Sequence, residues 1–338
     1  MRTWVSRALL CVALLAGAAG CDRVSDEPSA GGSRAAKPTK AASAAASPKP
    51  QVTAAMAAKQ GPPVVADKVM LGAFVSLLNT AQGPALTLRK QQLGRDFRIL
   101  HYYYEWTDQL PTAMPTVGAG QYALLSWRAP SYKAILNGSQ DALIAKQADR
   151  LAQYGKPVFL RWAWEMNGSW YVWGGAKNDS RPQDFTAAWR RVHDIFQAHN
   201  AVNVGWVWGP NWYSKPNEPW NEMINYYPGD AYVDWVAISG YGDSGLTPSA
   251  IYDAFYNQFA ARKPLMIAET GVNDRGGTTK PDWIDALGTW VKAHPAVAAI
   301  VWYDTDHSPG TKENFRLDST PGSLEAFKKI SSDAYFSG

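Results

Sequence analysis

Eight short runs rich in β-branched and aromatic residues alternate with segments of helical spacing, and this alternation limits the possible folds more than any other feature. The runs cover residues 69–75, 97–106, 122–129, 157–165, 202–211, 233–241, 264–271 and 297–305. Eight strands that alternate with helices predict an α/β protein, a single (β/α)8 TIM barrel over residues 67–338. An open doubly wound sheet would give a similar count, but no G-x-G-x-x-G turn follows the first run.

The first 21 residues have the pattern of a secretory signal peptide. Arg2 and Arg7 precede an apolar stretch, and small residues lead into Cys21. The segment "AAGC" resembles the lipobox of bacterial lipoproteins, with Ala18 in place of the usual Leu, so we expect a lipid on Cys21. An ordinary signal peptide cleaved near the same place is the alternative. We therefore expect an exported protein that a lipid holds in the bacterial cell envelope, on its periplasmic or surface face.

Residues 22–66 consist mainly of Ala, Ser, Pro, Lys and Gly and contain almost no aromatic side chains. This composition cannot bury enough apolar surface to offset chain entropy, so we predict a disordered linker. The linker carries several of the positive charges, and the net charge of the whole chain is only +4. We therefore expect no nucleic-acid partner. We also expect a monomer. Cys11 lies in the signal peptide, which leaves the mature domain without a disulfide or a cysteine metal site.

Two glutamates stand at the ends of predicted strands that face each other across the barrel mouth. Glu165 ends the fourth run and Glu269 ends the seventh. The active site of such a barrel lies at the carboxyl ends of its strands. Hydrolysis of a glycosidic bond needs one protonated and one ionised carboxyl group. Tryptophans around Glu165 favour its protonated form, so we expect Glu165 to be the acid and Glu269 the nucleophile. A separation of about 5 to 5.5 Å would make the enzyme retaining.

The chain contains 16 Trp and 16 Tyr, and many of them cluster at predicted strand ends and in the loops that follow. Such rings stack on the apolar faces of sugars, so the cluster predicts a cleft for a sugar chain. The alternative interpretation is that these rings only pack the barrel against its helices. The clustered rings are Tyr102, Tyr103, Tyr104, Trp106, Trp127, Trp170, Tyr171, Trp173, Trp206, Trp208, Trp212, Tyr213 and Trp220.

The segment "RWAWEMNGSWYVWGG" resembles the acid/base segment of glycoside hydrolase family 26, which usually contains R-x-x-H-E-M-N-G, and "IAETG" resembles the nucleophile strand of that family. The resemblance extends over about residues 69–327. It implies that Glu165 is the acid/base and Glu269 the nucleophile. It also implies substrate-binding positions. Arg161 helps to order the site, Tyr241 hydrogen-bonds the nucleophile, and Trp302 lies beneath the sugar at the cleavage site. Trp170 and Trp173 are on the leaving-group side, and Trp164 and Asn167 are further substrate-binding positions.

The family's usual histidine before the acid is replaced by Trp164. Because that histidine normally helps to bind the sugar, the replacement affects substrate identity more than the carboxylate pair. The resemblance implies a retaining, endo-acting β-glycoside hydrolase, and β-1,4-mannan is the first expected substrate. A mixed-linkage β-glucanase, a xylanase or an enzyme that trims the cell's own exopolysaccharide are alternatives within the family.

Other kinds of chemistry have little support. Five histidines are scattered without an H-E-x-x-H pattern, so we expect no catalytic zinc, no other metal at the site and no cofactor. A calcium ion on loop aspartates such as Asp274 and Asp306 is the alternative. No G-x-S-x-G turn is present, which disfavours a serine hydrolase. The alternative from another class is a polysaccharide-binding envelope lipoprotein without catalytic activity. Two opposed carboxylates argue against it, because a pure binder does not need them.

Overall fold

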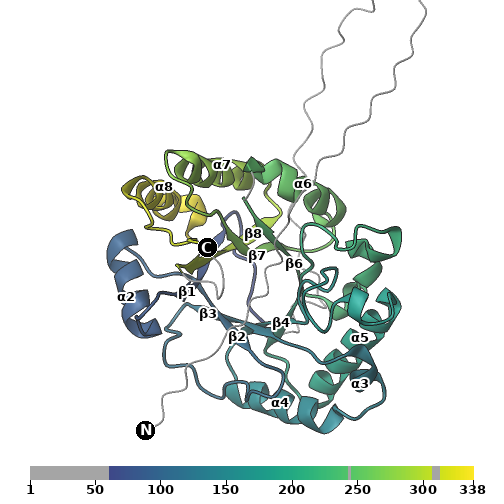
Figure 1. The fold of residues 1–338 in the computed structure, drawn as a ribbon. Coiled ribbons are helices and arrows are strands. Elements are labelled where there is room, and N and C mark those ends of the chain that lie inside the picture. The colour runs from purple at the N-terminus through teal and green to yellow at the C-terminus, as the bar shows by residue number, and fades with distance from the viewer. Residues whose placement is uncertain (1–60, 243–244, 307–312) are drawn as a thin grey trace, which may run out of the picture.

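A computed structural model describes residues 61–242, 245–306 and 313–338 (Figure 1). The predicted signal peptide, Cys21 and all but the last residues of the predicted linker lie outside these residues. Within them, no helix combines the length and the apolar character needed to cross a bilayer.

The strands close into a barrel, as predicted. Every pair of neighbours is parallel, and β1 pairs with both β2 and β8. The strands are β1 (Met70–Ser76), β2 (Ile99–Tyr104), β3 (Tyr122–Trp127), β4 (Val158–Trp162), β5 (Val204–Trp208), β6 (Trp235–Tyr241), β7 (Leu265–Gly271) and β8 (Val297–Thr305). Parallel pairing brings all eight carboxyl ends to one face of the barrel, where the candidate site residues lie.

Helices form a ring outside the barrel (Figure 1). They are α2 (Gln82–Leu93), α3 (Tyr132–Leu136), α4 (Asp141–Tyr154), α5 (Pro182–Ala198), α6 (Pro248–Phe259), α7 (Thr279–Ala293) and α8 (Pro321–Ser332). Two of them begin with a Thr-Pro pair: Thr247 Oγ1 accepts a hydrogen bond from the Ala250 amide, and Thr320 Oγ1 accepts one from the Ser323 amide. Both threonines satisfy amides that a helix N-terminus leaves without a partner.

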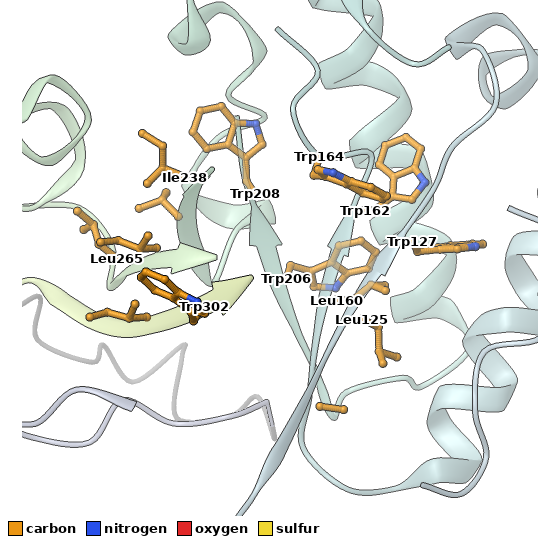
Figure 2. Close-up of a cluster of buried hydrophobic side chains, with 14 of the residues drawn as sticks. Leu125, Trp127, Leu160, Trp162, Trp164, Trp206, Trp208, Ile238, Leu265 and Trp302 are labelled. Carbon is orange, nitrogen blue, oxygen red and sulfur yellow. The ribbon is translucent and has the colours of Figure 1, made fainter. Parts of the chain in front are cut away.

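The side chains of each strand alternate between two cores. An inner core fills the barrel and includes Met70, Phe159 and Met266. The outer core lies between strands and helices, and Figure 2 shows part of it. The predicted cleft rings Trp127, Trp206 and Trp208 belong to this outer core and not to a sugar-binding surface. Their rings contact side chains such as Phe196 and Trp189 of α5 and Phe259 of α6, so these three tryptophans do not line the mouth of the barrel.

A buried ion pair joins α2 to β8. The Arg89 guanidinium donates two hydrogen bonds to Asp304, at 2.6 and 3.0 Å, and lies 2.7 Å from Asp318. The side chains of Arg89 and Asp304 are both fully buried. Asp304 also accepts a hydrogen bond from the Leu317 amide, so this pair holds the segment after β8 against the barrel.

Arg89→Met is expected to lower the free energy of unfolding by about 3–5 kcal/mol at neutral pH, because it leaves the Asp304 carboxylate buried without its partner. Burial raises the pKa of Asp304, and Arg89 opposes that rise. Without Arg89, Asp304 of the folded variant keeps its proton at pH values at which Asp304 of the unfolded chain has lost it. The loss should therefore shrink as the pH falls. Urea unfolding at two pH values measures both effects.

Lys90→Met is the matched control, because Lys90 is the next residue of α2 and its pair with Asp96 is more than half exposed. It should cost at most about 1 kcal/mol. A similar cost for both variants would contradict the assigned weight of the buried pair.

Candidate active site

Glu165 comes three residues after the end of β4, in a turn with unusual backbone angles. The φ angles of Ala163 and Glu165 are 47° and 54°, in the left-handed region that side chains rarely adopt. The Glu165 amide donates to the Gly209 carbonyl at 2.8 Å, which ties this turn to the end of β5. The Glu165 carbonyl accepts a hydrogen bond from the Gly168 amide. The turn thus fixes the backbone from which the glutamate side chain projects, and strain of this kind concentrates at functional sites.

Glu269 lies within β7, is only 4% exposed, and accepts three hydrogen bonds. The hydroxyl of Tyr103 and the Nη1 of Arg161 donate to Oε2 at 2.7 and 2.9 Å. The hydroxyl of Tyr241 donates to Oε1 at 2.6 Å, so the predicted contact of this tyrosine is present. Charge-assisted hydrogen bonds of this type orient a carboxylate strongly. Glu269 is therefore held in one position at the mouth of the barrel.

Glu165 has a different environment. It is 5% exposed, and the Trp170 indole donates to its Oε2 at 2.7 Å. Burial raises the pKa of Glu165 to about 7, and the charge of Glu269 adds to this rise. Arg161 and hydrogen bonds from Ser239 and Trp170 oppose it. A substantial fraction of Glu165 is therefore protonated at neutral pH, which is what a general acid needs.

Arg161 connects the two carboxyl groups. Its side chain is fully buried; Nη1 donates to Glu269 and Nη2 donates to the Ser239 hydroxyl. Ser239 lies where the pairing of β6 and β7 shifts register, next to Glu269. The same serine hydrogen-bonds Glu165. The Arg161 guanidinium and the Ser239 hydroxyl thus fix the two glutamates relative to each other.

Ser239 was not among the predicted site residues, and Tyr103 was predicted only as one of the clustered cleft rings, without a contact to the nucleophile. Successive side chains of a strand point to opposite faces of the sheet. Because Leu100 of β2 belongs to the outer core, the side chains of His101 and Tyr103 point to the inner face of the barrel, and this alternation could have identified Tyr103. Ser239 carries no comparable signal, since a small hydroxyl inside an apolar strand fits simple packing equally well.

The prediction that Trp302 lies beneath the sugar is wrong. Trp302 is 1% exposed, and its ring packs against Trp283 of α7 and Phe327 of α8, so it belongs to the outer core. The side chain of its neighbour Tyr303 points to the opposite face of the strand. The Tyr303 ring stacks on the ring of Phe74 of β1, with 5.2 Å between the ring centroids. Tyr303 also contacts Tyr241, so it is the aromatic residue of β8 that lies beside the site.

Asn167 and Trp173 are not placed to bind a substrate either. Asn167 is fully buried; its side chain hydrogen-bonds both the amide and the carbonyl of Asn211, so it joins the loops after β4 and β5. Trp173 is 2% exposed, stacks on Tyr171 and donates to the Trp164 carbonyl. Both residues support the loops of the site because their polar groups are already satisfied within the protein.

Trp164, predicted to bind substrate, is 1% exposed, and its ring contacts site residues. It lies 5.7 Å from the Arg161 guanidinium carbon and 5.5 Å from the Tyr103 ring. Tyr171 and Trp173 pack against its other parts. In this structure Trp164 therefore supports two of the three side chains that hold Glu269, Arg161 and Tyr103. Trp170 and Tyr241 remain partly exposed beside the carboxylates.

Within the described ranges, no group of three or more His, Cys, Asp or Glu side chains is arranged to hold a metal ion. The arrangement that remains is a pair of carboxyl groups in unequal environments, which Arg161 and Ser239 together connect.

Comparison with known proteins supports one interpretation of this pair. The sequence model of Glycosyl hydrolase family 26 matches residues 107–318. Endoglucanase H of Acetivibrio thermocellus is 30% identical over 254 residues, which are 70% of this chain and 27% of that protein. Mannan endo-1,4-beta-mannosidase A and B of Caldalkalibacillus mannanilyticus is 30% identical over 217 residues, 61% of this chain and 38% of that protein. Beta-1,3-xylanase TXYA of a Vibrio species is 27% identical over 49% of this chain and 33% of its own length.

The chain thus spans between about a quarter and two fifths of the length of these three relatives. Among solved structures, a beta-mannanase from Bacteroides ovatus superposes with a TM-score of 0.59 at 16% identity, covering 80% of this chain and 90% of that one. At such an identity the likeness concerns the fold.

Proposed function

The chain belongs to glycosyl hydrolase family 26. From this premise we propose that it is a retaining, endo-acting β-glycoside hydrolase, and we propose β-1,4-mannan as its main substrate. The observation that carries the proposal is the unequal pair of carboxyl groups. Glu269 accepts three hydrogen bonds, whereas burial raises the pKa of Glu165 to about 7. Paired carboxyl groups in two such environments are what acid and nucleophile require.

In the first step, an oxygen of Glu269 attacks the anomeric carbon of the sugar, and the bond from that carbon to the glycosidic oxygen breaks. Glu165 gives its proton to the departing oxygen. In the second step, Glu165 takes a proton from water, the water oxygen bonds to the anomeric carbon, and the bond to Glu269 breaks. Two inversions at one carbon retain its configuration. Tyr103, Tyr241 and Arg161 hold the nucleophile in place for both steps.

Mannan is proposed first because several relatives bear the name mannan endo-1,4-beta-mannosidase. Other relatives are named as an endoglucanase and as beta-1,3-xylanases. Mixed-linkage glucan, xylans and the cell's own exopolysaccharide are therefore the alternatives. Trp164 is the residue most expected to alter the preference, since it contacts the groups around Glu269 where the family usually has histidine.

A reducing-sugar and product-size assay on β-mannans, mixed-linkage glucan, xylans and bacterial exopolysaccharide tests this proposal. Cleavage of mannan into internal fragments with retained configuration at the new reducing ends is the expected result. Inverted products would overturn the proposed mechanism, and cleavage of a different polysaccharide would replace the substrate. Binding without cleavage anywhere in the panel would favour a non-catalytic polysaccharide-binding protein.

We also propose that the mature protein is a monomer that a lipid on Cys21 anchors in the cell envelope, with residues 22–60 as a tether. The basis is the small-residue segment before Cys21 and the composition of the linker. The last part of the predicted linker is not a tether, because Val64 and Val65 pack against the inner core of the barrel. Labelling with a fatty-acid analogue should mark the protein, and Cys21→Ala should abolish the label and release the protein from the membrane fraction. An unlabelled protein with a cleaved N-terminus would indicate an ordinary signal peptide.

The pKa of Glu165 predicts the alkaline limb of the pH profile. Because the acid must be protonated, kcat/KM is expected to fall as the pH rises through about 7. The hydrogen bond from Trp170 lowers the pKa of Glu165, so Trp170→Phe should move this limb to higher pH. Val172→Ala is the control, since Val172 is a nearby side chain that is 63% exposed. A limb that stays in place or moves to lower pH in Trp170→Phe would contradict the assignment.

A further inference from the structure

A groove with a volume of about 470 Å³ lies between the long loop after β5 and helix α6. Its lining combines aromatic and aliphatic side chains with amide and carboxyl groups. The side chains used below are Trp212, Tyr213, Asn217, Glu222, Met223 and Gln258. The two catalytic carboxyl groups are not part of this lining, so the groove is a separate surface.

A continuous set of aromatic rings connects the groove to Glu165. Trp170 donates to the Glu165 carboxyl group. The ring of Tyr213 lies 5.9 Å from that of Trp170, and the ring of Trp212 lies 5.0 Å from that of Tyr213. Tyr213 is 42% exposed, whereas most large hydrophobic side chains of the described residues are buried. The rings therefore form a partly open track from the acid to the groove.

The two sides of the site differ in the strands that build them. Apart from Arg161 of β4, the residues around Glu269 come from β1, β2, β6 and β8, and include Tyr103, Tyr241 and Tyr303. The track to the groove comes from the loops after β4 and β5, on the side of Glu165. Because Glu165 protonates the oxygen of the leaving group, a chain that follows this track is the leaving-group part of the substrate.

The wall of the groove is held in place before any ligand binds. The side-chain amide of Asn167 donates to the Tyr213 carbonyl and to the Ser214 hydroxyl, and the Trp212 amide donates to the Ser239 carbonyl. Asn221 donates to the Asn167 carbonyl and to the Pro216 carbonyl. Preorganised walls lower the entropy cost of binding.

We propose that this groove binds the distal leaving-group end of a neutral polysaccharide chain, a site that rests on the proposed function. Trp212 and Tyr213 offer ring faces to the apolar faces of sugars. Asn217, Glu222 and Gln258 offer acceptors and donors to hydroxyl groups. The carboxylate of Glu222 disfavours an acidic polysaccharide, because like charges repel. The groove thus selects long, uncharged substrates over short ones.

Two variants test the groove in the Glu269→Ala background, where the substrate stays intact. Trp212→Ala removes a ring, and Gln258→Trp fills the groove from an exposed position of α6. Affinity electrophoresis in gels that contain galactomannan or mixed-linkage glucan should show binding weakened on the order of tenfold by each variant. Asn257→Trp is the matched control, because Asn257 is the exposed neighbour of Gln258 and does not line the groove.

The same substitutions in the parent chain give a second measurement. The ratio of kcat/KM on polysaccharide to kcat/KM on an aryl glycoside should fall on the order of tenfold for Trp212→Ala and Gln258→Trp. Binding and ratio within twofold of the control would overturn the groove proposal, even where the parent hydrolyses the polysaccharide. A parent that hydrolyses nothing would overturn the proposed function, and gel binding would still decide the role of the groove.

Discussion

Glu269→Ala is expected to lower kcat/KM on the polysaccharide by on the order of 10⁵-fold while the protein stays folded. Without this carboxylate no group of the protein can bond to the anomeric carbon, so the covalent intermediate does not form. The side chain of Glu269 accepts hydrogen bonds from Tyr103, Arg161 and Tyr241, and alanine leaves these donors without their acceptor. Reducing-sugar release measures the activity, and binding to the intact polysaccharide shows whether the site still forms.

Glu105→Ala is the matched control, because Glu105 also follows a strand at the carboxyl-terminal face but is half exposed and pairs with Arg128 at 3.3 Å. It should retain nearly full activity. If Glu269→Ala kept activity comparable to that of the control, Glu269 would not be the nucleophile.

Glu165→Ala is expected to reduce hydrolysis of polysaccharide by about 10²–10⁴-fold. The loss should be far smaller on an aryl glycoside whose leaving group is already a weak base, because only a poor leaving group needs a proton. The alkaline limb of the pH profile should also disappear, since burial of this one carboxyl group raises its pKa to about 7. Steady-state kinetics on both substrates across the pH range measures these effects.

An equal loss on both substrates would show that Glu165 contributes to the step without donating the proton. Persistence of the alkaline limb in Glu165→Ala would assign that limb to another group. Glu105→Ala again provides the comparison, because its substitution removes a carboxyl group without touching the site.

The barrel could be predicted because it depends on patterns that repeat along the chain. Runs of buried strand residues, helical spacing between them and the Thr-Pro helix starts at Thr247 and Thr320 are all local features. The carboxylate pair could be predicted for a related reason. Glu165 and Glu269 each lie at or near the carboxyl end of a predicted strand run, and parallel strands bring their carboxyl ends to one face.

The aromatic residues show where this reasoning stops. Trp302 and Tyr303 are neighbours in β8, yet one packs against α7 and α8 and the other lies beside Tyr241. One step along a strand reverses the direction of a side chain, so a strand boundary that is uncertain by one residue leaves the choice open.

The sequence by itself determined the barrel, the two glutamates, Arg161 and Tyr241, because each follows from a local pattern or a motif. Only the tertiary structure decided which tryptophans face helices, that Asn167 joins two loops, and that Tyr103 and Ser239 complete the site. The physical reason is that hydrogen bonds and burial depend on groups brought together from distant strands. The pKa of Glu165 near 7 has the same origin, since burial by several loops produces it.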